Sequence, residues 1–410
     1  MKKSLLNLGL TFSCAVITLS LAVCAQAQTF AVLQNFNNTN GNRPLTPPIR
    51  ATDGNLYGAT LQGGTTSHGL IYKLTRQGKL SALYMFCSQP NCTDGSSPEF
   101  GPILGKDGSL YGTTSNGGAN NLGVVYKITL SGNLSVLHSF CHCAEGWYPN
   151  SLVEDGKGGF FGTTLEDGSH QFGAIFHLSA QGKMTTLYNF CDSQPTCIDA
   201  YSNTGEPQPL IRGADGNIYG ITTTGGQSFY LCSPGGCGTV FKITPRGQFS
   251  IVYSFCSLAN CADGGSPAWL ILGSDGNFYG TTSLGGSEAS GGTVFQLTTS
   301  GVLNPLHSFS AAKGSGSGYA PYNLIQANNS MLYGTTFFGG NNEGSQCQQI
   351  GCGTVFSVTS SGAFESLHSF SASDGYAPAG VAQTSDNTLR GTTSYGGAHK
   401  DGVIFSIDLN

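Results

Sequence analysis

Cysteines are the reactive residues with the most regular spacing in this sequence. Of the 14 cysteines, Cys14 and Cys24 lie in an apolar segment at the start, and the other twelve form six close pairs. An even number of closely spaced cysteines is typical of disulfides in exported proteins. The pairs do not repeat the Cys-x2-Cys unit of structural zinc sites, so disulfides are favoured over a metal. The pairs are Cys87/Cys92, Cys141/Cys143, Cys191/Cys197, Cys232/Cys237, Cys256/Cys261 and Cys347/Cys352.

Aromatic residues near amide and carboxylate groups are the second set of candidate functional residues. Trp269 and Tyr322 follow prolines at equivalent places in the chain, and Glu99 and Asn150 hold comparable positions. Together with Trp147, such residues suit the recognition of a sugar or a peptide. Packing within loops is the alternative explanation. In the fold predicted below, these residues lie on the face that carries the long loops. Further aromatic residues assigned to that face are Tyr148, Tyr201, Phe229, Tyr230, Phe337 and Phe338.

Histidines occur in two settings. His138, His307 and His368 occupy one position of a repeated pattern where other copies have tyrosine, so we interpret them as packing residues. Four more histidines fall in loops. We expect their side chains to be solvated, because imidazole groups are common ligands only when several of them converge. The loop histidines are His68, His142, His170 and His399.

Acidic residues are spaced for turns. Asp-Gly pairs begin at Asp53, Asp107, Asp215 and Asp275, and each offers one carboxylate without the further oxygen ligands of a calcium loop. The sequence has no Gly-x-Ser-x-Gly nucleophile elbow and no P-loop lysine motif. We therefore predict no cofactor, no metal and no catalytic residue.

A repeated segment must position all of these side chains. A Leu-Tyr-Gly-Thr-Thr-like string recurs seven times, with 54, 50, 58, 60, 54 and 57 residues between successive aromatic positions. The copy at 265–309 contains four strand-like runs, a (266–272), b (277–282), c (293–298) and d (302–309), separated by Asp-Gly, Gly-Gly and Ser-Gly. A period of this size predicts a propeller or a solenoid. The aromatic positions are Tyr57, Tyr111, Phe161, Tyr219, Tyr279 and Tyr333, followed by Arg390.

The two ends of the chain together supply one complete copy. The last copy lacks strand d, whereas residues 30–36 match strand d and have no strand a, b or c before them. Ring closure explains both facts, because the N-terminal strand would complete the blade formed by residues 376–409 and leave only short, protected edges. The sequence predicts an all-β, seven-bladed β-propeller with four-stranded blades, closed by the N-terminal strand. Prolines at the start of strand a fit its place as the innermost strand.

This fold would sort the cysteines onto one face. Four pairs follow strand d and two lie between strands b and c, and these loops emerge on the same side of an up-and-down blade. The opposite face would carry only tight turns. Cys141 and Cys143 are separated by one residue, which strains a direct bridge and leaves pairing with a neighbouring loop open.

The sequence resembles the GloVer tandem-repeat family of exported bacterial proteins, which often carry one of several C-terminal anchors. The resemblance covers essentially the whole chain after the N-terminal segment. It depends on strings such as residues 107–114 (Asp-Gly-Ser-Leu-Tyr-Gly-Thr-Thr), 123–129 and 137–140. It implies a β-propeller-like repeat protein but no activity and no catalytic residues. No C-terminal anchor segment is evident in this sequence, which departs from the family in this respect, so the resemblance does not by itself imply attachment to a surface.

The N-terminus and the charge place the protein outside the cytoplasm. Lys2 and Lys3, an apolar run and Ala25-Gln26-Ala27 predict a signal peptide over residues 1–27, cleaved near Ala27; a lipoprotein modified at Cys24 is the alternative. Cleavage leaves 15 basic and 22 acidic residues, a net charge of −7. This charge argues against nucleic acid as a partner, and no other apolar run could span a membrane.

We therefore expect one domain over residues 28–410, secreted or periplasmic and monomeric. The favoured function is a binding scaffold that holds a carbohydrate, peptide or protein on its long-looped face. A propeller-type lyase or hydrolase with its site at the channel mouth is the alternative. An enzyme would need histidines and carboxylates to converge there, but Glu99 is the lone acid among the residues after the strand-a prolines.

Overall fold

The computed structural model describes residues 28–409, apart from 167, 170–171, 192–209, 227–231, 233–234, 288–289, 313–315, 342–346, 348–349 and 386. The predicted signal peptide lies outside the described residues. So do Cys197, His170 and three of the aromatic candidates, Tyr201, Phe229 and Tyr230.

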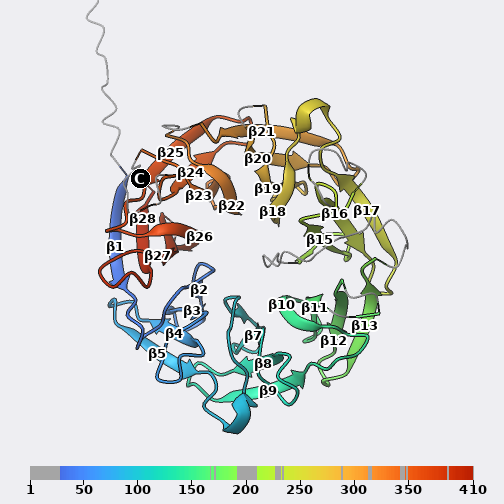
Figure 1. Ribbon diagram of the computed structural model, residues 1–410, viewed down its shortest axis with the longest axis vertical. Coiled ribbons are helices and arrows are strands. Elements are labelled where there is room, and N and C mark those ends of the chain that lie inside the picture. Colours follow the sequence, from blue (N-terminus) through green and yellow to red (C-terminus); the bar gives the residue numbers. More distant parts are fainter. Residues whose placement is uncertain are drawn as a thin grey trace, which may run out of the picture.

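Seven four-stranded antiparallel sheets are arranged as blades in a ring (Figure 1). In each of blades 1 to 6, consecutive strands run from the innermost to the outermost position, which are repeat strands a to d. Blade 1 comprises β2 (Ile49–Arg50), β3 (Leu56–Thr60), β4 (Leu70–Leu74) and β5 (Leu80–Met85). Blade 2 comprises β6 (Ile103–Leu104), β7 (Leu110–Thr114), β8 (Val124–Ile128) and β9 (Leu134–Ser139). Blade 3 comprises β10 (Trp147–Glu154), β11 (Phe160–Glu166), β12 (Ala174–Leu178) and β13 (Met184–Asn189).

The next three blades follow the same plan. Blade 4 comprises β14 (Ile211–Arg212), β15 (Ile218–Thr222), β16 (Thr239–Ile243) and β17 (Phe249–Ser254). Blade 5 comprises β18 (Gly265–Leu272), β19 (Phe278–Leu284), β20 (Ser290–Leu297) and β21 (Leu303–Ser310). Blade 6 comprises β22 (Tyr319–Gln326), β23 (Leu332–Phe338), β24 (Thr354–Val358) and β25 (Phe364–Ser369). Two short 3₁₀ turns, Pro90–Cys92 and Ala259–Cys261, lie in the loops that follow β5 and β17.

Blade 7 is built from both ends of the chain. Its order is β26 (Tyr376–Ser385), β27 (Thr388–Tyr395), β28 (Val403–Asp408) and then β1 (Thr29–Asn35). β1 pairs antiparallel with β28, with Thr29 opposite Asp408 and Asn35 opposite Val403. The predicted seven-bladed propeller closed by the N-terminal strand is confirmed.

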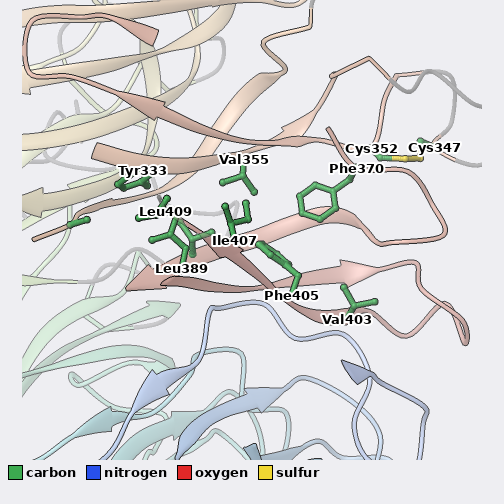
Figure 2. Close-up of a cluster of buried hydrophobic side chains, with 12 residues drawn as sticks. Tyr333, Cys347, Cys352, Val355, Phe370, Leu389, Val403, Phe405, Ile407 and Leu409 are labelled. Atoms are coloured by element: carbon green, nitrogen blue, oxygen red, sulfur yellow. A yellow bond between two sulfur atoms is a disulfide. The ribbon is translucent and has the colours of Figure 1, made fainter. Parts of the chain in front are cut away.

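The core lies in the layers between neighbouring blades. Between blades 6 and 7, Tyr333 and Val355 pack in one cluster with Leu389, Phe405 and Ile407 (Figure 2). The glycine in the middle of strand b makes room for the aromatic side chain of strand c in the same blade. A Cβ at Gly280 would lie 2.4 Å from the Phe295 ring and 2.4 Å from the Trp269 carbonyl oxygen. The position therefore excludes every larger residue while the cross-strand aromatic stays in place.

Buried threonines join strand b of blades 2, 5 and 7 to the next blade. Thr113 Oγ1 donates a hydrogen bond to the Asn150 carbonyl oxygen at 2.8 Å, between blades 2 and 3. Thr392 Oγ1 donates to the Thr46 carbonyl oxygen at 2.9 Å, between blades 7 and 1. The corresponding Oγ1 of Thr335 is buried and has no hydrogen-bond partner among the described residues. Blade 7 is therefore fixed to blade 1 by the same type of contact as blades in mid-chain.

The a–b and c–d turns form one face of the ring, which we call the tight-turn face. Asp53 accepts hydrogen bonds there from the Asn55 amide at 3.0 Å and from the Tyr57 hydroxyl at 2.7 Å. Burial alone would raise the pKa of Asp53, but hydrogen bonds from Tyr57, Asn55 and Lys73 outweigh it and lower the pKa to about 2. Asp107 forms the matching set in blade 2 and also has a pKa of about 2. The interpretation of these acids as turn residues is confirmed.

Candidate functional site

The d–a and b–c loops emerge on the other face, which we call the long-loop face, and they carry the disulfides. Cys87–Cys92, Cys141–Cys143 and Cys256–Cys261 follow strand d of blades 1, 2 and 4. Cys232–Cys237 and Cys347–Cys352 lie in b–c loops of blades 4 and 6. These five predicted pairs are confirmed, and Cys141 bonds to Cys143 itself. For the pair with Cys191, the partner Cys197 lies outside the described residues.

An acidic residue anchors several d–a loops to strand d. The Tyr84 hydroxyl donates to Asp94 at 2.7 Å, and the backbone amide of Ser88 donates to the same carboxylate at 2.9 Å. His368 occupies the equivalent position in blade 6 and lies 3.1 Å from Asp374. Burial opposes ionisation of Asp374, but the hydrogen bonds from His368 and Ser371 prevail and lower its pKa. His138, which lies 2.9 Å from Glu145, and His368 were expected to be packing residues and also hold loops in place.

A pocket of about 260 Å³ opens on the long-loop face between blades 5 and 6. Its aromatic wall consists of Tyr322, Phe337 and Phe338, and the prolines near the starts of β18 and β22 also line it. The rings of Tyr322 and Phe337 meet edge to face, with centroids 5.8 Å apart. Thr223, Ser266 and Ser283 add hydroxyl groups to the lining. An apolar ring surface beside a few hydroxyls is typical of a small-molecule site.

The five residues predicted to bind a ligand lie in three separate places. Trp269 contacts Tyr322, with ring centroids 5.8 Å apart, so these two stand together beside the pocket. Trp147 and Asn150 both belong to β10, where Trp147 packs on Tyr148 at 4.3 Å and the buried Asn150 accepts a hydrogen bond from the Ser151 amide. Glu99 lies apart from both, in blade 2.

Glu99 has a distinct electrostatic setting. Burial raises the pKa of its carboxyl group, while a hydrogen bond with Ser115 and the charge of Arg43 partly oppose that rise. The Arg43 guanidinium also lies over the ring of Tyr395, 5.4 Å from its centroid. Arg43 and Tyr395 come from blades 1 and 7, and Glu99 belongs to blade 2. The three side chains therefore come from three blades.

Three groups of side chains have the spacing of metal ligands, but cysteines dominate each of them. They are His68 with Cys87 and Cys92, Cys232 with Cys237 and Cys256, and Cys141 with Cys143 and Glu145. Every one of these cysteines is disulfide-bonded. A cysteine binds metal as the thiolate, so the oxidised pairs are not ligands. Within the described parts of the chain, no group of three histidines and acids converges on a common point.

Two wall residues of the pocket, Phe337 and Phe338, are absent from the five predicted binding residues. Phe337 directly follows the Gly-Thr-Thr string of blade 6, where Ser115, Ser283 and Ser394 occupy the same position in other blades. This departure from the repeat is the signal that could have found the pocket. The sequence places Phe337 and Phe338 on this face, but the repeat pattern does not show that they share a pocket with Tyr322.

The repeat identifies the family. The chain matches the Gloeobacter/Verrucomicrobia repeat, abbreviated GloVer, over residues 18–230 and 206–410. The chain belongs to the GloVer repeat family. No curated protein sequence matches this GloVer protein. In the part of it that the structure describes, no helix is long and apolar enough to cross a membrane.

Solved structures with a similar fold differ widely from this GloVer protein in sequence. A catalytically inactive variant of virginiamycin B lyase from Staphylococcus aureus, with quinupristin, is 15% identical with a TM-score of 0.57, covering 93% of this chain and 100% of the lyase. The extracellular domain of the putative hybrid two-component system BT4673 from B. thetaiotaomicron is 11% identical with a TM-score of 0.57, over 93% and 42% of the chains. Puromycin hydrolase is 10% identical with a TM-score of 0.53, over 87% and 50%. These likenesses show the propeller fold alone.

Proposed function

We propose that this protein is a binding scaffold whose long-loop face holds a small ligand in the pocket between blades 5 and 6. The observation that carries the proposal is the aromatic wall formed by Tyr322, Phe337 and Phe338 around about 260 Å³ of space. Rigid aromatic rings provide a large contact area at low entropic cost, and the neighbouring hydroxyls supply hydrogen bonds. A sugar ring or a short peptide matches this combination.

The strands that carry the lining residues of the pocket support a role in recognition. Its walls lie on β18, β22 and β23, so the aromatic groups are carried by strands rather than by the loops alone. Trp269 also contacts Tyr322, with ring centroids 5.8 Å apart. A site supported in this way needs little rearrangement on binding, which favours affinity.

The alternative of a lyase or hydrolase has weaker support. Virginiamycin B lyase and puromycin hydrolase share the fold, but function depends on the site and not on the fold. Glu99 is a carboxyl group with a raised pKa, as a general acid would require. However, no histidine or second acid joins it in a group of three among the described residues. We therefore assign recognition rather than catalysis to the long-loop face.

An array of oligosaccharides and peptides tests the proposal. The decisive variant is Phe337→Ser, because serine is the natural residue at this position in blades 2, 5 and 7. We expect about tenfold weaker binding to any ligand found, since one ring of the aromatic wall is lost. Leu165→Ser, at the same repeat position in blade 3, is the matched control. No signal on either array, or a signal unchanged by Phe337→Ser and Trp269→Ala, would refute the assignment.

We also propose that the protein is exported and folds as one domain over residues 28–410. The signal-like segment at residues 1–27 and the five described disulfides support export, because such bridges persist in oxidising compartments. N-terminal analysis of protein recovered outside the cytoplasm checks this. A new terminus at Gln28 supports cleavage after Ala27, a lipid on Cys24 indicates the lipoprotein route, and an intact Met1 contradicts both.

A further inference from the structure

A second pocket lies on the tight-turn face where blade 7 meets blade 1. Its volume is about 360 Å³. Arg50, Arg76 and Arg390 line it together with three apolar side chains, Leu33, Leu56 and Leu74. The arginines come from β2, from the c–d turn of blade 1 and from β27, so two blades contribute. The pocket is on the face of the ring opposite the aromatic pocket and is independent of it.

The concentration of arginine here is unusual for this chain. The sequence contains six arginines and has a formal net charge of −5, yet three of the six line this one pocket. The repeat does not require them. In blade 2 the residues at the positions of Arg50, Arg76 and Arg390 are Leu104, Leu130 and Tyr111.

Arg390 is the clearest departure from the repeat. It replaces the strand-b aromatic, which in blade 1 is Tyr57 with its hydroxyl bonded to the turn acid. Among the described residues, no hydrogen bond or ion pair to the Arg390 guanidinium is present. Asp408 attracts it at longer range, but the Asp408 carboxylate accepts hydrogen bonds from Thr29 at 3.3 Å and Thr388 at 3.1 Å. Burial lowers the pKa of Arg390, so this cation is partly desolvated without a direct partner.

The other two guanidinium groups are held in place by the backbone. Arg50 Nη1 donates to the Thr384 carbonyl oxygen of blade 7. Arg76 donates from Nε to the Gly54 carbonyl oxygen and from Nη2 to the Asp53 carbonyl oxygen, both at 3.3 Å. Each guanidinium has five N–H donors, so further donors remain for a ligand. The Asp53 carboxylate is itself paired with Lys73 at 3.2 Å and does not neutralise Arg76.

We propose that this pocket is a binding site for a small molecule that carries a phosphate or sulfate group. Three guanidinium groups line this one cavity, and arginine binds phosphate and sulfate oxygens through paired hydrogen bonds. Partial desolvation strengthens such contacts, because water competes less with the anion. The leucine side chains give room for an uncharged portion of the ligand, such as a sugar ring.

Isothermal titration calorimetry of the full mature chain tests this site. The probes are inorganic phosphate and sulfate, then glucose 6-phosphate and glucose 6-sulfate, each measured against chloride at matched ionic strength. We expect saturable binding of at least one oxyanion, with tighter binding of its sugar ester. The separate phosphate and sulfate arms identify which group the pocket prefers.

Variants taken from the repeat itself locate the binding. Arg390→Tyr and Arg76→Leu each install the residue found at that position in blade 2, and each should weaken oxyanion binding about tenfold or more. Arg212→Leu is the control, because Arg212 occupies the position of Arg50 in blade 4 and does not line the pocket. It should bind as the parent does.

Two results would overturn the proposal. One is that the parent protein binds neither oxyanion above the chloride background. The other is that Arg390→Tyr and Arg76→Leu, with an unchanged circular dichroism spectrum, bind as tightly as the parent. If Arg390→Tyr does not fold, Arg76→Leu decides the matter, because Arg76 is an exposed turn residue.

Discussion

Replacing Thr392 by valine isolates one of the hydrogen bonds that join neighbouring blades. Thr392 is fully buried, and its Oγ1 donates to the Thr46 carbonyl oxygen at 2.9 Å. Valine has nearly the same shape, so the substitution removes the donor and little else. The Thr46 carbonyl group then stays buried between blades 7 and 1 without this partner.

The cost of leaving a buried carbonyl group without its donor is about 1–3 kcal/mol. The unfolding entropy of about 2.1 cal/mol/K per residue gives roughly 0.8 kcal/mol/K for a chain of this length. The melting temperature of Thr392→Val should therefore fall by roughly 1–4 °C. Thr113→Val removes the equivalent bond between blades 2 and 3 and should have a similar effect.

Thr335→Val is the matched control for this experiment. Thr335 occupies the same repeat position and is equally buried, but its Oγ1 has no hydrogen-bond partner among the described residues. Its replacement should leave the melting temperature unchanged or raise it, because an unsatisfied hydroxyl group is removed. Differential scanning calorimetry under non-reducing conditions measures all three variants. If Thr335→Val loses as much stability as Thr392→Val, packing rather than hydrogen bonding sets the effect and our reasoning is wrong.

Three further perturbations test other features of the ring. The pKa of Asp107 is lowered from its ordinary 3.8 to about 2 in the folded state, so this carboxylate stabilises the fold above about pH 4, and the contribution is lost as the pH falls towards 2. Asp107→Asn should therefore be less stable than the parent at neutral pH, and urea titrations should show the gap closing between about pH 4 and pH 2; a constant gap would contradict this. Replacing Cys87 and Cys92 together by serine should lower the free energy of unfolding by about 2 kcal/mol, as expected for a loop this short, and urea unfolding should detect it; an unchanged midpoint would refute the estimate. Gly280→Ala should cost about 1–3 kcal/mol, because its Cβ would collide with the Phe295 ring and the Trp269 carbonyl oxygen, and a melting temperature equal to that of the parent would show that both groups can move away.

Much of the fold could be predicted because the repeat occurs seven times in the sequence. The strings around Tyr57, Tyr111 and Tyr279 fix strand b, and glycine-rich turns separate it from its neighbours. The unpaired strand at 30–36 and the incomplete last copy predicted closure, which the pairing of Thr29 with Asp408 confirms. The repeated pattern is strong because every copy must bury the same face against its neighbours.

The candidate sites were harder to predict because they depend on departures from the repeat. Phe337 and Arg390 each occupy a position that other copies fill with a different residue type. Such a departure is visible in the sequence. The sequence does not show which residues of the adjacent blade lie next to the departing side chain. Arg390 lines the same pocket as Arg50 and Arg76, which lie more than 300 residues earlier in the chain. Only the closed ring places these side chains in one pocket.

The pairing of β1 with β28 also determines the order in which the molecule can be completed. Thr29 and Asp408 are hydrogen-bonding neighbours although 379 residues separate them. Blades 1 to 6 each consist of a continuous segment and can form as the chain emerges, whereas blade 7 must wait for the last strand. β1 is therefore an unpaired strand until synthesis or export is finished, when its edge is open to aggregation. Joining residues 29 and 408 through a short linker and opening the chain in another blade would remove this delay while keeping every blade intact.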